Sequence, residues 1–237
     1  MRTPLAALGL SLLCLAACGR TAQRPDVSWR SPPGSAPGAL ARADDQAEPP
    51  LEALPRPTPS PTPSASQAVA LDRAAALSIA SERHYAAGDL PAAIADAQQA
   101  LEIREQALGP DHLDVASTLT SLAELYAVNE EYAAAEPLLR RALAIREAAF
   151  GPSQPLVAES LSNLGLLYAA WGRYGEAEPF YQRAIGLLER APANAPQLAV
   201  VLDNYAALLA DSGRPEGARA LEARARALRD APAPAAD

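Results

Sequence analysis

The chain has 237 residues and a formal net charge of −8 at pH 7. All twenty of its basic residues are arginine, but the acidic balance argues against a nucleic-acid-binding surface. Hydrophobic residues make up 49% of the chain and are mostly alanine and leucine, which favour helices, whereas aromatic residues make up only 5%. The composition therefore predicts an all-α protein.

The N-terminus has the layout of an export signal. A short positive start precedes an apolar run of about 13 residues, Leu5 to Ala17, which ends at Cys18. A transmembrane helix needs ~20 apolar residues, so residues 1–17 are predicted to be a signal peptide. The segment 15–18, Leu-Ala-Ala-Cys, resembles the processing box of bacterial lipoproteins. This resemblance implies cleavage before Cys18 and acylation of that cysteine. An ordinary secreted protein with a chance cysteine is the alternative.

The lipoprotein resemblance also implies a location. Gly19 follows the cysteine where retention in the inner membrane would want aspartate, so we expect a lipid anchor in the cell envelope, in the outer membrane facing the periplasm. Cys14 lies within the signal peptide. The mature chain would then hold one cysteine, used by the lipid, and could form no disulfide and no paired-cysteine metal or redox site.

Residues 18–66 are predicted to be a disordered tether. Eleven of the forty-eight residues from 19 to 66 are proline, and over 55–63 every second residue is proline. Proline fixes φ and lacks a backbone donor, so this segment favours extended polyproline II geometry over helix. A spacer between membrane and folded domain is one interpretation, and a docking peptide for a proline-binding module is the other. Residues 231–237 are predicted to be a disordered tail.

Internal repeats indicate the fold of residues 67–230. The segment 115–156 aligns without a gap on the segment that begins at Val157, with Leu119 on Leu161 and Tyr126 on Tyr168. A step of 42 residues back, or of 41 forward, finds two further and weaker copies. We therefore predict four repeats, at about 73–114, 115–156, 157–197 and 198–230.

Each repeat is predicted to be two helices. Glycine and asparagine accept the left-handed conformation that ends a helix, and such pairs divide each copy: Gly88-Asp89, Asn129-Glu130, Gly172-Arg173 and Gly213-Arg214. Gly-Pro pairs at 109–110 and 151–152 end the copies themselves. Asp111 and Ser153 follow these pairs, and their side-chain oxygens are expected to cap the next helix.

The repeat pattern resembles a known family. The first helix of each middle copy follows Leu-x-x-Leu-Gly/Ala-x-x-Tyr, which resembles the tetratricopeptide repeat. The first and last copies depart from it, with His84 and Leu209 in place of the tyrosine. The 42-residue period, the loop at 109–116 and the Tyr-x-x-Ala-Glu-Pro motif at 132–137 and 174–179 are similar to the kinesin-light-chain type. The resemblance implies an α-solenoid, a right-handed superhelix of about four helix-turn-helix repeats. It also implies that Pro137 and Pro179 bend their helices without breaking them.

No residue pattern indicates catalysis. Lysine is absent, and the sequence has no serine elbow, no phosphate-binding loop and no paired-cysteine zinc pattern. The two histidines are interpreted as structural: His84 stands at an aromatic core position, and His112 packs or caps in the loop between repeats. We therefore predict that the chain is not an enzyme, has no catalytic or metal-binding residues and needs no cofactor.

The family resemblance implies that first helices line the inner wall of the superhelix, where a partner binds. The inner-wall positions expected to contact a peptide are Ser78, Glu82, Glu124, Glu159, Asn163, Leu166, Asp203 and Asn204. Asn163 and Asn204 match the position at which kinesin-light-chain-like repeats use asparagine to hold a peptide backbone, since an amide both donates and accepts. Every charged residue in this set is an acid, which predicts an extended protein or peptide ligand of neutral or basic character.

These features together predict a membrane-anchored protein-protein interaction scaffold or adaptor in the bacterial cell envelope. A structural repeat protein that forms homo-oligomers is one alternative, and a pilotin-like factor in pilus or secretin biogenesis is another. The sequence leaves open the partner, the pathway and the oligomeric state.

Overall fold

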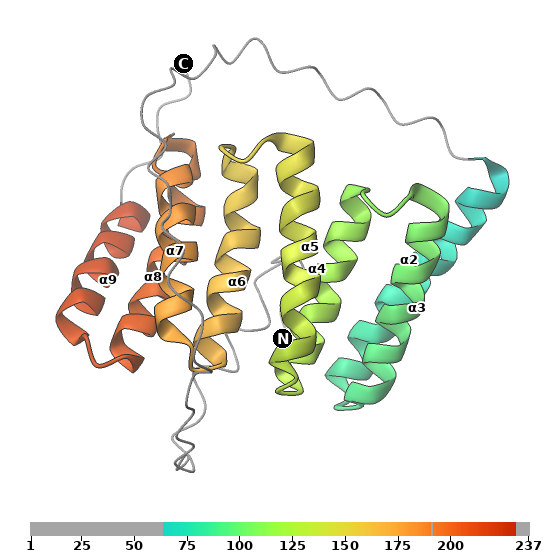
Figure 1. Ribbon diagram of the computed structural model, residues 1–237, viewed down its shortest axis with the longest axis horizontal. Helices are drawn as coiled ribbons and strands as arrows, with labels where there is room; N and C mark the ends of the chain where they lie inside the picture. Colours follow the sequence, from blue (N-terminus) through green and yellow to red (C-terminus); the bar gives the residue numbers. More distant parts are fainter. Residues whose placement is uncertain (1–63, 191, 231–237) are drawn as a thin grey trace, which may run out of the picture. The chain divides into compact units, whose positions relative to one another are not determined.

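The computed structural model describes residues 64–190 and 192–230, which form eight α-helices and two short 3₁₀-helices with no strand. The expected signal peptide, Cys18, most of the tether and the tail lie outside these residues. The helices pair into four hairpins in chain order (Figure 1): α2 (Ala65–Ala86) with α3 (Leu90–Leu108), α4 (Leu113–Val128) with α5 (Tyr132–Phe150), α6 (Ala158–Ala170) with α7 (Tyr174–Leu188), and α8 (Ala195–Asp211) with α9 (Pro215–Asp230). The 3₁₀-helices η2 (Pro155–Val157) and η3 (Pro192–Asn194) precede α6 and α8.

Successive hairpins stack on one another. The second helix of each hairpin packs against the first helix of the next, α3 on α4, α5 on α6 and α7 on α8. The first helices α4, α6 and α8 also contact one another in sequence. The all-α solenoid of four helix-turn-helix repeats that the sequence predicts is confirmed. The first helix, α2, begins at Ala65, two residues before the expected start of the domain, and Ser64 caps it.

The turns inside the hairpins occur where the sequence predicts them, with one difference. Gly88 and Gly172 adopt left-handed φ values of 81° and 77°. In the second hairpin Glu130 takes this conformation, with φ of 63°, whereas Asn129 stays at −77°. The left-handed conformation expected at Asn129 was therefore wrong by one residue. Asn129 is still the C-terminal cap of α4, and the chain turns at Glu130.

Neither Asp111 nor Ser153, the two residues expected to cap the helices that follow the Gly-Pro pairs, does so. Asp111 does not cap α4; His112 does, with Nδ1 accepting the backbone N–H of Asp114 at 3.1 Å. No side chain caps α6, because the 3₁₀ turn of η2 leads directly into the helix and takes the place that Ser153 was expected to fill. The capping role of His112 is confirmed.

The other histidine is not in the core. The side chain of His84 is 45% exposed, and its Nδ1 lies 2.8 Å from a carboxylate oxygen of Asp96. The polar ring at this position therefore faces outward and joins α2 to α3.

The largest buried cluster extends over α4 to α9 and consists mainly of alanine and leucine. Small residues let the two helices of a hairpin approach closely: Ala123, Ala135 and Ala177 are fully buried. At Gly165 the approach is closest, since a Cβ atom there would lie 2.8 Å from the ring of Tyr181. The ring of Tyr181 thus occupies the space that any side chain at position 165 would need.

Polar contacts connect the second hairpin to the third. The Tyr168 hydroxyl of α6 donates to Glu136 at 2.6 Å and accepts from Arg140 at 2.7 Å, both on α5. The expected i,i+4 pair of Glu136 and Arg140 is confirmed, with 2.8 Å between nitrogen and oxygen. Pro137 lies between them, and α5 continues through it without a break, as α7 does through Pro179.

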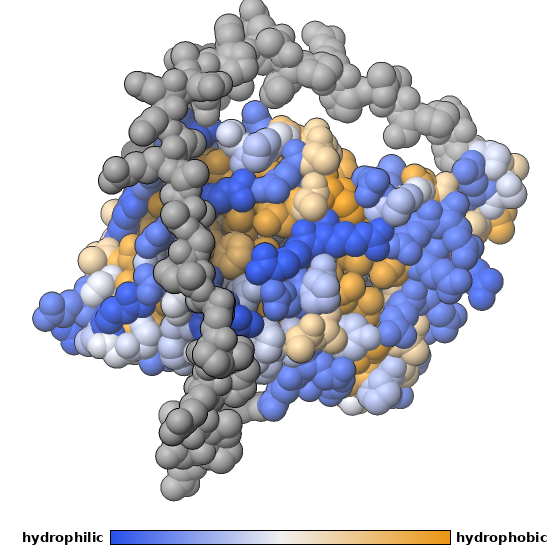
Figure 2. Space-filling view, in the orientation of Figure 1, coloured by the Kyte–Doolittle hydropathy of each residue, from blue (hydrophilic) through white to orange (hydrophobic). Residues whose placement is uncertain are grey.

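The face shown in Figure 2 carries hydrophilic residues over most of its area, with apolar surface exposed between them. The last helix, α9, buries only Ala218 and Ala225 and turns charged side chains outward, as suits the end of a repeat stack. None of the helices among the described residues combines the length and the apolar character needed to cross a bilayer.

Candidate functional site

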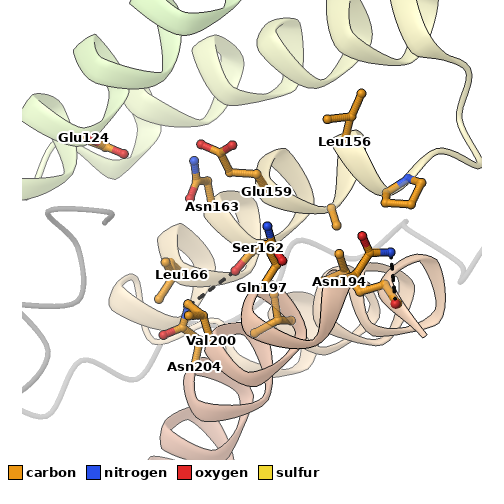
Figure 3. Close-up of a pocket in the computed structure, with 14 residues that line it drawn as sticks. Glu124, Leu156, Glu159, Ser162, Asn163, Leu166, Asn194, Gln197, Val200 and Asn204 are labelled. Carbon is orange, nitrogen blue, oxygen red and sulfur yellow. Dashed lines mark hydrogen bonds between the residues drawn. The ribbon is translucent and has the colours of Figure 1, made fainter. Parts of the chain in front are cut away.

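A pocket lies between the first helices of the last three hairpins, α4, α6 and α8 (Figure 3). Its volume is about 340 Å³, within the range of about 300–1,000 Å³ that is typical of ligand pockets. The lining side chains come from α4, η2, α6, the end of α7, η3 and α8: Glu124, Pro155, Leu156, Ala158, Glu159, Ser162, Asn163, Leu166, Leu188, Asn194, Gln197, Val200, Val201 and Asn204.

Two helical stripes form the walls. On α6 the stripe is Glu159, Ser162, Asn163 and Leu166, and on α8 it is Gln197, Val200, Val201 and Asn204. Residues at i, i+3, i+4 and i+7 lie on one face of a helix, so each stripe presents a continuous surface to the pocket. The pocket therefore follows from the helical period and from the contact of successive first helices.

Five of the eight residues expected on the inner wall line this pocket: Glu124, Glu159, Asn163, Leu166 and Asn204. The other three do not. Ser78 and Glu82 are on α2, in the first hairpin, and the Ser78 hydroxyl donates to the backbone of its own helix at Ala74. Asp203 forms an ion pair with Arg229 of α9, so its carboxylate is occupied within the domain.

The two asparagines are buried at the base of the pocket. Asn163 is 4% exposed, and its side chain makes no hydrogen bond to any other described residue. Figure 3 shows its amide directed into the pocket, one helical turn from Glu159. Asn204 is 9% exposed, and its Nδ2 lies 3.5 Å from the Ser162 hydroxyl oxygen. Asn163 thus offers the pocket a donor and an acceptor that no described side chain or backbone group occupies.

The pocket is acidic. Burial, together with the negative charge of Glu159, raises the pKa of Glu124 from 4.5 to about 7, against the opposing effect of Arg146. Arg146, on α5, donates to the hydroxyls of Thr120 at 3.3 Å and Ser160 at 2.5 Å and forms no ion pair with either acid of the pocket within the described part of the chain. At neutral pH Glu124 therefore exchanges between its charged and uncharged forms.

Several lining residues were missed by the sequence analysis. Gln197 lies one turn before Val200 on the same face of α8, so extending the helical period would have found it. No helical period marks Leu156 in η2 or Asn194 in η3. Both residues lie in connections between hairpins, and the path of such a connection is decided by the residues against which it packs. Leu156 is 62% exposed. Asn194 also donates to the Leu188 carbonyl at 3.3 Å, which fixes the connection after α7.

The arrangement of these side chains suits the binding of a ligand. Amides supply hydrogen bonds, Leu156, Leu166 and Val200 supply apolar surface, and two carboxylates supply negative charge. In residues 64–190 and 192–230 no three histidine, cysteine, aspartate or glutamate side chains gather in an arrangement that could hold a metal ion.

The family model of the tetratricopeptide repeat matches residues 72–148 and 114–190, which together cover half of the chain. The chain belongs to the tetratricopeptide repeat family. Tetratricopeptide repeats are in general non-catalytic scaffolds for protein-protein interaction. No curated protein matches the chain in sequence.

Solved structures with tetratricopeptide repeats share the fold. BtubC (BKLC) from P. vanneervenii matches with a TM-score of 0.58 and 22% identity, over 69% of this chain and 68% of its own. A protein of Podosopora anserina named as a kinesin light chain, with nearly identical TPR-like repeats, matches with a TM-score of 0.57 and 21% identity, over 66% of this chain and 75% of its own. Aspartyl phosphate phosphatase F from Bacillus subtilis matches with a TM-score of 0.53 and 21% identity, over 68% of this chain and 42% of its own. The expected likeness to kinesin-light-chain-type repeats is confirmed for the fold.

Proposed function

We propose that the chain is a lipid-anchored scaffold of the bacterial cell envelope whose repeats hold an extended peptide segment of a partner protein, without catalysis. The observation that carries the binding role is the pocket between α4, α6 and α8, with the Asn163 amide buried at its base. An amide that no side chain or backbone group of the described residues occupies can both donate to a ligand and accept from it. A peptide backbone, with donors and acceptors alternating, supplies a partner for both.

The spacing of the two asparagines suits an extended chain. Asn163 and Asn204 lie on successive first helices, α6 and α8, which are in contact. Packed helices are about 8–10 Å apart, and an extended chain rises about 3.3 Å per residue. The two amides can therefore hold peptide groups about three residues apart, while apolar side chains of the ligand meet Leu166 and Val200.

Site-specific crosslinking in intact envelopes tests the binding role. A photoreactive residue at Val200, which lines the pocket, should crosslink to a peptide of a partner protein that mass spectrometry can identify. The same residue at Glu102, which is exposed on the second helix α3, provides the control. The Asn163→Ala, Asn204→Ala double variant should lose the crosslink from Val200. Crosslinks that are equal from both positions, or that survive the double variant, would refute binding in the pocket.

The anchor is supported by the sequence alone, through the apolar run that ends at Cys18. Acyl chains add about 0.8 kcal/mol of membrane affinity per buried methylene, so a doubly or triply acylated cysteine anchors a protein stably. The chain should incorporate labelled palmitate and sediment with membranes, and Cys18→Ser should abolish both. Membrane association that persists without label would refute the lipid anchor.

Self-association is a second candidate function, favoured by two exposed apolar side chains on α2. Val69 is 70% exposed and Ile79 is 50% exposed, whereas the helix at the other end of the stack is charged outward. Size-exclusion chromatography with light scattering should then give a stable oligomer in the absence of partners. A Val69→Asp, Ile79→Asp variant should be monomeric, and a monomeric parent protein would refute this candidate.

A further inference from the structure

We propose that Glu124 and Glu159 form a subsite for one cationic side chain, lysine or arginine, of the bound peptide, and that Asn163 orients this side chain. This inference rests on the proposed function, since it names the ligand chemistry of the same pocket. The two carboxylates come from different repeats, α4 and α6, and both line the pocket. A cation between them would connect the second and third hairpins through the ligand.

Several acids elsewhere in the domain form ion pairs, whereas these two form none with the described residues. In three cases an arginine later in the chain pairs with an acid: Arg141 with Glu105, Arg214 with Glu178 and Arg229 with Asp203. Glu124 and Glu159 have no ion pair with any described residue. No ion pair within the described part of the chain therefore compensates the charge of these two carboxylates.

The surroundings leave room for one positive charge. The charged groups that face Glu124 are Glu159 of α6 and Arg146 of α5, and Arg146 is engaged with hydroxyls on α4 and α6. The residues that α8 contributes to the pocket are uncharged. An arriving ammonium or guanidinium group would thus meet two carboxylates and no competing cation inside the pocket.

Asn163 is the second observation that points to a ligand. The residue is 96% buried, and its amide is aimed into the pocket without a hydrogen-bond partner among the described residues. It lies four residues after Glu159, on the same face of α6. An amide oxygen beside a carboxylate gives a lysine ammonium or an arginine fork two acceptors from one helix turn.

Binding of such a cation should depend on pH in a defined direction. The pKa of Glu124 is raised to about 7 in the free protein by burial and by Glu159. A bound cation favours the charged carboxylate, so binding lowers this pKa and releases a proton. Affinity for a cationic peptide should therefore rise as the pH increases through about 7.

Selection from a library of short random peptides on the purified protein tests the subsite. Selected peptides should share one position that is strongly enriched in lysine or arginine. In the best peptide, replacing that residue by norleucine should raise Kd about tenfold above pH 7 and have a smaller effect below pH 6. The Glu124→Gln and Glu159→Gln variants should each remove most of this difference, whereas Glu82→Gln, outside the pocket, should not.

The outcomes separate the inference from the function on which it rests. If peptides are selected with no cationic preference, or if the preference survives both glutamine variants, the subsite is refuted and peptide binding stands. If no peptide is selected, the proposed function fails and the subsite fails with it. The glutamine variants keep the size of the side chain, and their far-UV circular dichroism should match that of the parent protein.

Discussion

Replacing Gly165 by alanine tests whether the approach of α6 to α7 is as close as the structure shows. The added Cβ would lie 2.8 Å from Cζ of Tyr181 and 2.9 Å from Cε1 and Cε2, whereas carbon atoms in contact prefer about 3.5–4.0 Å. Tyr181 is fully buried and stacks on Tyr205 with 5.6 Å between ring centroids, so its ring cannot withdraw freely. Overpacking of this kind costs about 1–3 kcal/mol.

The better helix propensity of alanine offsets about 1 kcal/mol of this cost, so a matched control is needed. Gly186, on α7, is exposed, and a Cβ there would meet nothing within 4 Å. Gly186→Ala should therefore raise the free energy of unfolding by about 0.5–1 kcal/mol. Gly165→Ala should be less stable than Gly186→Ala by about 1–3 kcal/mol.

Urea unfolding followed by far-UV circular dichroism measures both glycine variants against the parent protein. Equal stabilities of Gly165→Ala and Gly186→Ala would show that Tyr181 does not occupy the space beside Gly165. A parallel shift of both variants to higher urea would lead to the same conclusion. Either result would refute the close packing inside the third hairpin.

Three further predictions concern single side chains. The pKa of Glu124 is about 7 in the folded protein and 4.5 in the unfolded chain. The contribution of Glu124 to stability is therefore complete below pH 4.5 and is lost by about pH 7, a change of about 3 kcal/mol in the free energy of unfolding. Urea unfolding across this pH range should show this loss for the parent protein and not for Glu124→Gln. Tyr168→Phe removes the hydroxyl between Glu136 and Arg140 and should lower the free energy of unfolding by about 1–2 kcal/mol in the same assay. Ala177→Leu, at a fully buried position, should cost about 1–3 kcal/mol, and an unchanged urea midpoint would contradict tight packing there.

Much of the candidate site could be predicted from one sequence because it repeats with the helical period. Glu159, Asn163 and Leu166 lie on the same face of α6 whatever surrounds it, and Asn204 follows from the 41-residue step to the next copy. Asp203 shows the limit of this reasoning. It is one residue from Asn204, yet Arg229, twenty-six residues later, pairs with it. The reach of one long side chain across two helices leaves no periodic trace in the sequence.

The sequence by itself determined the helices, their pairing and the small residues between them, because each depends on neighbours within a few turns or on a period that recurs along the chain. Only the tertiary structure decided which polar groups are occupied: that Asn163 is buried without a hydrogen-bond partner among the described residues, and that burial beside Glu159 raises the pKa of Glu124. These properties depend on the distance between side chains from different repeats and on the water they exclude, which local residue order does not encode.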